Sequence, residues 1–268
     1  MDFLNIHQWA FMFLFATLLQ NKIRNMKTLY HAAQSRGHAY HGWLNTYHSF
    51  SFANYYNPDR INFGVLRVLN DDTIAEGMGF GRHPHRDMEI ISIPLDGALE
   101  HRDSMGNEGV IRRGEIQVMS AGTGVEHSEY NHNKTEEVKF LQIWLFPREL
   151  NLTPRYDQKT IDIKASENNF LNILSPSKED DTVWINQDAW FYWSNLKEGV
   201  SKKYILNKEG NGVYIFVLKG QLRIADHILT DRDALGVWDT ENFDIVAHED
   251  TEVLIMEMSM ELPTYLKN

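Results

Sequence analysis

Two short stretches of the sequence, RHPHR at residues 82–86 and VEHSE at residues 125–129, organise the interpretation of the whole chain. Each stretch places two side chains that can bind metal two residues apart. Side chains alternate between the two faces of a β-strand, so in a strand each pair projects from one face. Two facing pairs would offer three imidazoles and one carboxylate to a single ion. The four candidate ligands are His83, His85, His127 and Glu129.

The sequence around these stretches predicts an all-β fold. Short apolar runs at Val65–Leu69, Ile90–Leu95, Ile116–Met119 and Phe140–Leu145 are separated by turn-forming residues, and helical periodicity is nearly absent. Many short strands at regular spacing are typical of a sandwich or barrel. Pro84 lacks an amide hydrogen, so we expect its strand to lie at a sheet edge or to be bulged there.

The second half of the chain resembles a second copy of the first. LDGAL at residues 95–99 has a counterpart in LKGQL at residues 218–222, each after an apolar run. An internal repeat of this size predicts two tandem β-domains, residues 26–150 and 151–268. The residues at the four ligand positions of the repeat are Leu206, Lys208, Val246 and His248. Only one of them binds transition metals readily, so the second domain should lack the metal and should support the site or close one of its walls.

The amino-acid composition excludes several kinds of metal ligand and binding partner. The chain of 268 residues has no cysteine and a formal net charge of -11 at pH 7. Without cysteine there are no disulfides, thiolate metal sites or cysteine nucleophiles, so any metal must bind to histidine and carboxylate ligands. The acidic balance argues against direct nucleic-acid binding, which normally leaves a basic footprint, and leaves protein partners open.

The first 25 residues do not fit the rest of the sequence. Trp9–Leu19 is almost wholly apolar but shorter than the roughly 20 residues that a membrane span requires. Asp2 stands where a signal peptide carries positive charge. Because Met26 opens what resembles an ordinary cytosolic start, we expect residues 1–25 to be an upstream extension absent from the natural, cytoplasmic product. The alternative is a peripheral membrane anchor.

Residues 31–64 are dense in aromatic residues and histidine. We favour packing in the core and between domains for Trp43, Phe52 and Tyr55, among others. The alternative is that these rings line the mouth of a pocket for a flat ligand. Three histidines of this region have no partner at ligand spacing and are expected to be hydrogen-bonded or solvated: His38, His41 and His48.

Two further motifs lie close to the candidate ligands in sequence. Glu89, four residues after His85, is either a fifth ligand or a partner that orients an imidazole, and we favour the second role. His101-Arg102-Asp103 is interpreted as the end of a strand that enters a turn.

The motifs resemble those of the cupin superfamily. Its first motif, Gly-x5-His-x-His-x3-Glu, is matched by Gly77, His83, His85 and Glu89. In its second motif the spacing of Gly124, His127 and Asn131 is kept, with Gly122 in place of a proline. The carboxylate of Glu129 and the strings at residues 41–44, 47–53, 83–89, 101–107 and 119–124 are similar to those of the pirin branch of that superfamily.

This resemblance implies a bicupin, with two tandem double-stranded β-helix (jelly-roll) domains and one divalent transition metal in the first. The metal would be bound by His83, His85, His127 and Glu129, with iron favoured and nickel, copper, manganese or zinc also suited to such ligands. Some pirins are quercetin 2,3-dioxygenases, which cleave a flavonol with O₂ and release carbon monoxide. Eukaryotic pirins are instead transcriptional cofactors, so a non-enzymatic, redox-responsive regulator acting through protein partners is the alternative. Another cupin reaction on a small enol is a third possibility.

The chemistry of such a site assigns a role to Glu129. A divalent ion with three neutral imidazoles and one carboxylate leaves a net positive charge, which a deprotonated flavonol would neutralise. Glu129 would accept the hydroxyl proton and is therefore the expected catalytic residue. The expected reactants are a small aromatic enol and O₂.

Overall fold

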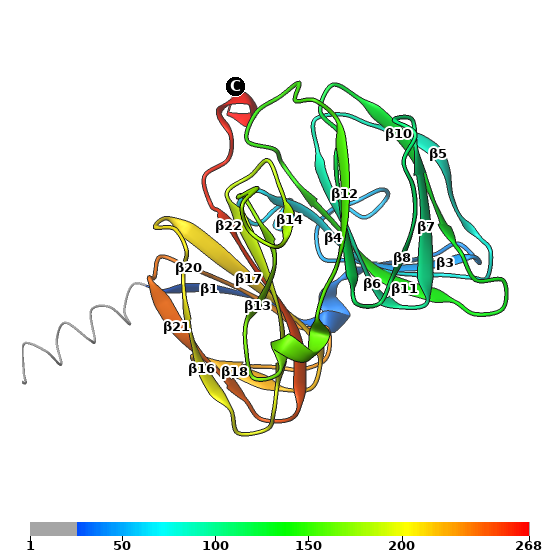
Figure 1. Cartoon of the computed structure of the whole chain (residues 1–268). Helices are drawn as coiled ribbons and strands as arrows, with labels where there is room; N and C mark the ends of the chain where they lie inside the picture. The colour runs from blue at the N-terminus through cyan, green and yellow to red at the C-terminus, as the bar shows by residue number, and fades with distance from the viewer. Residues whose placement is uncertain (1–25, 268) are drawn as a thin grey trace, which may run out of the picture.

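The computed structural model describes residues 26–267, and strands form nearly all of their regular secondary structure. Figure 1 shows two β-lobes side by side, one formed mainly by the first half of the chain and the other by the second half. Each lobe pairs a seven-stranded sheet with a four-stranded sheet. The all-β prediction is confirmed, and the matching sheets agree with the internal repeat.

The first lobe carries the candidate ligands. Its large sheet has the order β12-β9-β6-β11-β4-β3-β2, and its small sheet has the order β5-β10-β7-β8. The strands predicted from apolar runs correspond to β4, β6, β9 and β11. The bounds are β2 Gly37–Tyr40, β3 Leu44–His48, β4 Leu66–Ile74, β5 Gly79–His85, β6 Glu89–Asp96, β7 Ala98–Asp103, β8 Glu108–Arg112, β9 Glu115–Ser120, β10 Val125–Asn131, β11 Val138–Leu145 and β12 Arg155–Thr160.

The second lobe repeats this plan with sheets β1-β20-β17-β22-β15-β13-β14 and β16-β21-β18-β19. Short 3-10 helices occur at Ala33–Ser35, Ile163–Ser166 and Thr264–Leu266. The strand bounds are β1 Lys27–His31, β13 Leu171–Ser175, β14 Val183–Trp184, β15 Ala189–Leu196, β16 Ser201–Ile205, β17 Asn211–Lys219, β18 Leu222–Ile224, β19 His227–Leu229, β20 Ala234–Trp238, β21 Asn242–Ala247 and β22 Thr251–Ser259.

The two halves of the chain exchange edge strands. β1, from the start of the described chain, pairs with β20 of the second lobe. β12, which follows residue 150, pairs with β9 of the first lobe. The division of the sequence at residue 150 stays a prediction. One strand from each side of this position pairs with the lobe formed by the other side.

One apolar core joins the lobes. It contains Leu66 and Ile143 from the first half together with Phe191, Phe216 and Leu254 from the second, each at most 1% exposed. Burial of apolar surface is the main favourable term in folding, so the second lobe stabilises the first directly.

The interior of the second lobe is filled by its own side chains. An apolar cluster of this lobe includes Tyr204 and Phe243, and the Tyr204 hydroxyl donates a hydrogen bond of 2.8 Å to the buried Glu257 carboxylate. Within residues 26–267, both groups of histidine and carboxylate side chains with metal-like spacing belong to the first lobe.

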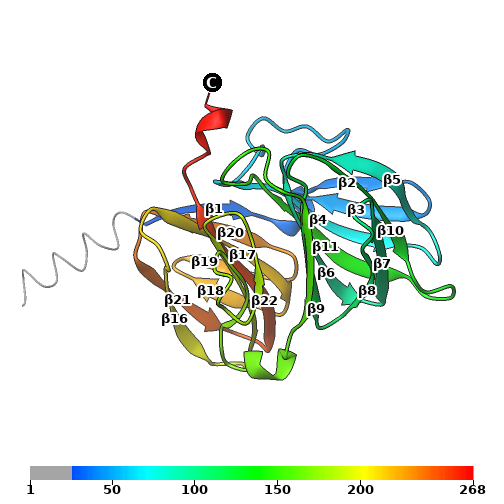
Figure 2. The same ribbon diagram turned by 45° about the horizontal axis from the view of Figure 1, so that its top comes forward.

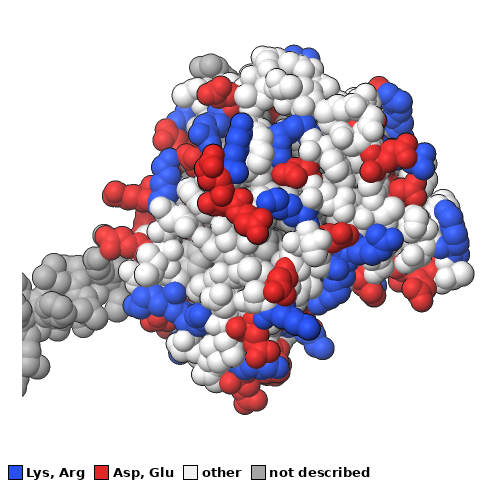
Figure 3. All heavy atoms as spheres, viewed as in Figure 1, with Lys and Arg blue, Asp and Glu red and all other residues white. Residues whose placement is uncertain are grey.

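The small sheet of the first lobe lies far from the second lobe. Figure 1 and Figure 2 both place β5, β10 and β7 on the side of the first lobe that faces away from the second. The surface in Figure 3 intersperses acidic and basic side chains. The predicted extension, residues 1–25, lies outside the described residues. Between residues 26 and 267, no helix has the length and hydropathy of a membrane span.

The turn before β10 requires a glycine. Gly122 has φ +44°, and a Cβ atom built on it would lie 1.9 Å from the carbonyl oxygen of Leu152. The Thr123 amide donates a hydrogen bond of 2.9 Å to the same Leu152 oxygen, and the Asp87 amide donates one of 2.9 Å to the Gly122 oxygen. The proline of the cupin motif is therefore replaced by a residue that lets two segments approach closely.

We expect Gly122→Ala to lower the free energy of unfolding by about 1–3 kcal/mol more than Gly106→Ala. Gly106 is the matched control, because its φ is +92° but nothing lies within 4 Å of a built Cβ. Both variants carry the left-handed strain of roughly 1–2 kcal/mol, so their difference isolates the crowding against Leu152. Urea denaturation of both variants measures it, and equal losses would contradict the close approach.

Candidate metal centre

Pairing between β5 and β10 brings the two histidine stretches together. His127 lies opposite His83, and Val125 lies opposite His85. From His127 to Glu129 the register advances two residues on β10 but three on β5, from His83 to Phe80, so β5 is bulged there. β5 is also the edge strand of its sheet. The edge position predicted from Pro84 is therefore confirmed, whereas the bulge lies at Gly81 and Arg82 and not at Pro84, which pairs regularly with Glu126.

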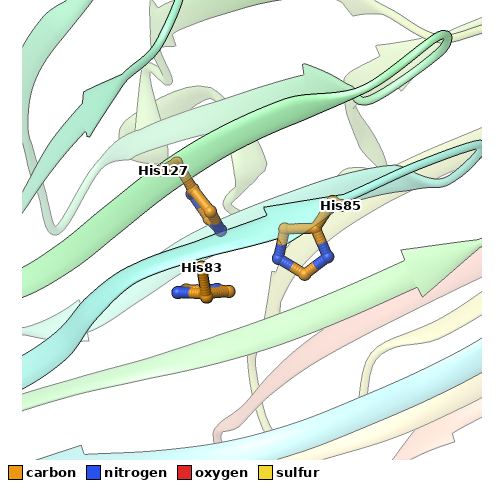
Figure 4. A group of neighbouring side chains, drawn as sticks. All are labelled: His83, His85 and His127. Carbon is orange, nitrogen blue, oxygen red and sulfur yellow. The ribbon is translucent and has the colours of Figure 1, made fainter.

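The three imidazoles form one cluster. Their ring centroids are 4.8 Å apart for His83 and His85, 4.4 Å for His83 and His127, and 4.8 Å for His85 and His127. Figure 4 shows the rings converging from the two strands on a common point. One nitrogen of each ring lies within 4.8 Å of the others, which is a spacing that one ion can bridge.

The protonation of these rings suits a metal. Burial, followed by the neighbouring histidines, lowers the pKa of both His85 and His127 to about 3, so both are neutral at pH 7. His83 Nδ1 lies 2.7 Å from the Gly81 carbonyl, which can only accept, so Nδ1 carries a hydrogen and Nε2 is the nitrogen available to a metal. His127 Nε2 is buried without a hydrogen-bond partner. Neutral imidazoles with free lone pairs are the form that binds metal, so the residues fit such an ion.

Glu129 lies beside this cluster in a polar niche. Ser92 Oγ donates to its Oε1 at 2.9 Å, and Gln142 Nε2 donates to its Oε2 at 2.6 Å. A carboxylate oxygen of Glu129 lies within 4.8 Å of a ring nitrogen of His127 and of a ring nitrogen of His101. His127 therefore belongs both to the imidazole cluster and to a second group formed with His101 and Glu129. Burial raises the pKa of Glu129. The carboxylate is thus oriented by two donors next to one of the three imidazoles.

Glu89 does not occupy the expected place. Its buried carboxylate accepts hydrogen bonds from Ser120 Oγ at 2.8 Å and from Asn186 Nδ2 at 3.2 Å. Asn186 belongs to the second half of the chain, so Glu89 connects the halves instead of orienting an imidazole. The expectation was wrong because β6 belongs to the large sheet, whereas the histidines lie on the small one.

The structure adds a residue that the sequence analysis missed. His101, on β7, is fully buried and places Nδ1 3.4 Å from Nδ1 of His127. Its Nε2 lies 3.3 Å from Oδ2 of Asp103, and its ring stacks on Tyr156 with centroids 4.8 Å apart. β7 does end at Asp103, as predicted. The missed signal is the spacing of His101 and Asp103, which is the same two-residue period that marks the other candidate pairs.

A cavity of about 800 Å³ opens at the cluster and is lined, among others, by His83, His85 and Glu129. Its lining lies wholly in the first lobe, so the second lobe supports the site without closing a wall. Three aromatic residues for which we expect packing line this cavity instead, as the alternative interpretation predicts: Trp43, Phe52 and Tyr55. Sequence could not separate the two interpretations, because both place aromatic rings against apolar surface.

Polar side chains form another part of the pocket lining. Asn70 and His48 line it and are hydrogen-bonded to each other, with 2.8 Å between Asn70 Oδ1 and His48 Nδ1. Asp72 also lines it, is only 3% exposed, and has an oxygen, Oδ1, without a hydrogen-bond partner. Burial raises the pKa of Asp72 to about 7. The predicted hydrogen bonds are present for His48 and for His38, whose Nε2 lies 2.8 Å from Asn45 Oδ1.

Comparison with known proteins shows the family to which the chain belongs. The family model described as Pirin matches residues 29–145, and the one described as Quercetinase C-terminal cupin domain matches residues 172–258. The quercetin 2,3-dioxygenase of Escherichia coli (strain K12) is 45% identical over 227 residues, covering 84% of this chain and 96% of that protein. A putative quercetin 2,3-dioxygenase of Pseudomonas aeruginosa is 42% identical over 224 residues, covering 83% and 96%.

Solved structures give the same result. The crystal structure of YhhW from Escherichia coli matches with a TM-score of 0.83 and 42% identity over 88% of this chain and 99% of that one. The structure of this bacterial pirin in complex with nickel(II) matches with a TM-score of 0.82 and 41% identity over 87% and 99%. With two cupin lobes, a histidine cluster in the first and these relatives, the chain belongs to the pirin family, whose bicupin fold it shares.

Proposed function

We propose that this protein is a metal-dependent dioxygenase that cleaves a flavonol-like enol with O₂, in the manner of quercetin 2,3-dioxygenase and with release of carbon monoxide. The observation that carries the proposal is the position of His83 and His85, two members of the imidazole cluster, which line a cavity of about 800 Å³ together with Glu129 and aromatic rings. Sites for small molecules are commonly clefts of about this size with apolar walls and a few convergent polar groups.

Three imidazoles and one carboxylate would hold the metal: His83, His85, His127 and Glu129. When bound, a divalent ion supplies a Lewis acid that lowers the pKa of a substrate hydroxyl. Iron is the metal we expect first. The nickel(II) complex of the Escherichia coli pirin supports a divalent transition metal in general, because nickel and iron accept the same nitrogen and oxygen ligands.

Glu129 would accept the proton of the enol hydroxyl. Its carboxylate is held by Ser92 and Gln142, which leaves each oxygen a further lone pair for a proton. Burial raises its pKa, which brings its basicity closer to that required of a base at neutral pH. The cavity also supplies rings against which a flat substrate packs, including Trp144, whose ring lies 4.9 Å from that of His85.

Asp72 would accept a hydrogen bond from another hydroxyl of the substrate. Asp72 belongs to the cavity lining, and its buried Oδ1 atom has no hydrogen-bond partner within the protein. An unpaired buried polar atom is costly, so a ligand that donates to it is favoured over one that does not. This supports a polyhydroxylated aromatic substrate over a purely apolar one.

The proposal is tested by aerobic incubation with quercetin of protein loaded separately with iron, nickel, copper or manganese, with carbon monoxide measured. One carbon monoxide per quercetin consumed, with at least one metal, is the expected result. No turnover with any of them would contradict the proposal and would favour the non-enzymatic regulator or another cupin reaction.

Glu129→Gln is expected to lower quercetin turnover by about 100-fold or more, because the amide cannot accept the hydroxyl proton. The matched control is Glu126→Gln on the same strand, whose carboxylate is exposed and pairs with Arg82 at 2.7 Å. The control should keep wild-type turnover. Undiminished turnover in metal-loaded Glu129→Gln would refute the role of Glu129 as the base.

Asp72→Asn is expected to stabilise the protein, and more so at pH 8 than at pH 5. Asp72 has a pKa of about 7 in the folded protein, so between about pH 4 and pH 7 folding retains a proton that the unfolded chain releases. Wild-type stability therefore falls across this interval, whereas an amide does not titrate. The gain should be larger at pH 8 than at pH 5 by about 1–3 kcal/mol.

The control for this experiment is Asp71→Asn on the same strand. Asp71 pairs with Arg36 at 3.1 Å and with Arg232 at 2.9 Å, so its replacement should lower Tm at both pH values. Thermal unfolding of both variants gives the comparison. A pH-independent effect of Asp72→Asn would show that Asp72 is not held protonated by burial.

A further inference from the structure

We propose that Asp103 and His101 form a buried hydrogen-bonded chain that fixes the tautomer of His127 and thereby presents His127 Nε2 to the metal. The inference rests on the proposed metal site, but not on its substrate or reaction. His101 and Asp103 would be positioning residues, which act through His127 without touching the metal.

The hydrogen-bonded chain is formed where β7 pairs with β10. His127 lies opposite Asp103, and Glu129 lies opposite His101. The side chains of His101 and Asp103 are both 0% exposed, so water cannot replace the contacts between them. A histidine and a carboxylate therefore lie on the strand next to β10, on the side away from β5.

Asp103 is built to accept hydrogen bonds. Its Oδ1 receives the backbone N–H groups of Met105 at 2.9 Å and Asn107 at 3.0 Å, and its Oδ2 receives Asn107 Nδ2 at 2.8 Å. A carboxylate that receives three N–H donors is an acceptor toward its fourth neighbour as well. The hydrogen between Asp103 and His101 therefore lies on His101 Nε2, 3.3 Å away.

That assignment determines the positions of the other hydrogens in this hydrogen-bonded chain. We assign the ring hydrogen of His101 to Nε2, which leaves Nδ1 as the accepting nitrogen. Gln117 Nε2 lies 3.5 Å from the same Nδ1 and shares this acceptor. His127 Nδ1, at 3.4 Å, must then donate to it. Neutral His127 is left with a lone pair on Nε2, the buried atom that has no partner within the protein.

The same geometry separates His101 from the metal ligands. His101, His127 and Glu129 also lie close enough to hold an ion. However, the Nδ1 atoms of His101 and His127 already face each other at hydrogen-bond distance, and Tyr156 stacks on the His101 ring. Hydrogen-bond partners that orient ligating imidazoles in this way raise metal affinity by about 10–100-fold.

Asp103→Asn is the sharpest test, because an amide at this position donates to His101 Nε2 and reverses the chain. His101 would then carry its hydrogen on Nδ1, and His127 would carry its own on Nε2, the atom assigned to the metal. We expect zinc(II) and nickel(II) affinity, measured by calorimetry on the full chain, to fall about 10–100-fold. Arg102→Gln is the control, since the Arg102 side chain is 60% exposed, and it should bind as wild type.

Nitrogen-15 NMR of the histidine side chains provides the readout that a merely structural role would not change. In metal-free wild-type protein His127 should be the Nδ1–H tautomer and His101 the Nε2–H tautomer, and Asp103→Asn should reverse both. His101→Phe, which keeps a ring for Tyr156 to stack on, serves if Asp103→Asn does not fold, and should also weaken metal binding.

The outcomes separate the two proposals. His127 as the Nε2–H tautomer in wild-type protein, or unchanged affinity in folded Asp103→Asn and His101→Phe, would overturn this inference while leaving the metal site intact. Absence of metal binding by wild-type protein would instead contradict the proposed metal centre. Quercetin turnover enters neither readout.

Discussion

The register between β5 and β10 is the constraint on which the rest of the site depends. Because His127 lies opposite His83 and side chains alternate along each strand, a shift of one residue on either strand would turn its histidines to the other face of the sheet. The bulge that follows on β5 lets Phe80 and not Gly81 lie opposite Glu129. Pro84 belongs on this edge strand, where its missing amide costs no hydrogen bond within a sheet.

Much of this arrangement could be predicted from the sequence because it is local. The spacing of His83, His85 and His127 needs only the two-residue period of a strand, and apolar runs indicate where the strands of the large sheet lie. His101 was missed because its role depends on the pairing of β7 with β10, which no local pattern shows. The exchange of β1 and β12 between lobes escaped prediction for the same reason. Glu89 was misplaced because a motif gives spacing along the chain without saying which sheet a side chain belongs to.

The site combines two kinds of buried polar group. Glu129, His101 and Asp103 have their hydrogen bonds supplied by the protein and hold fixed positions. His127 Nε2 and Asp72 Oδ1 are buried without partners. Such atoms destabilise a fold unless a ligand binds them. The apolar core shared with the second lobe stabilises the fold and offsets this cost. Gln117 Oε1 and Trp144 Nε1 also lack partners, and we assign His127 Nε2 to the metal and Asp72 Oδ1 to the substrate.

The central claim is that one metal ion binds where β5 meets β10, and the metal content per chain tests it most directly. Protein equilibrated with a divalent metal, freed of excess ion and analysed by mass spectrometry should contain one ion per chain. The double variant His83→Ala, His85→Ala should contain almost none while keeping its β-rich circular dichroism spectrum. An equal metal content in the wild type and the folded double variant would contradict the account.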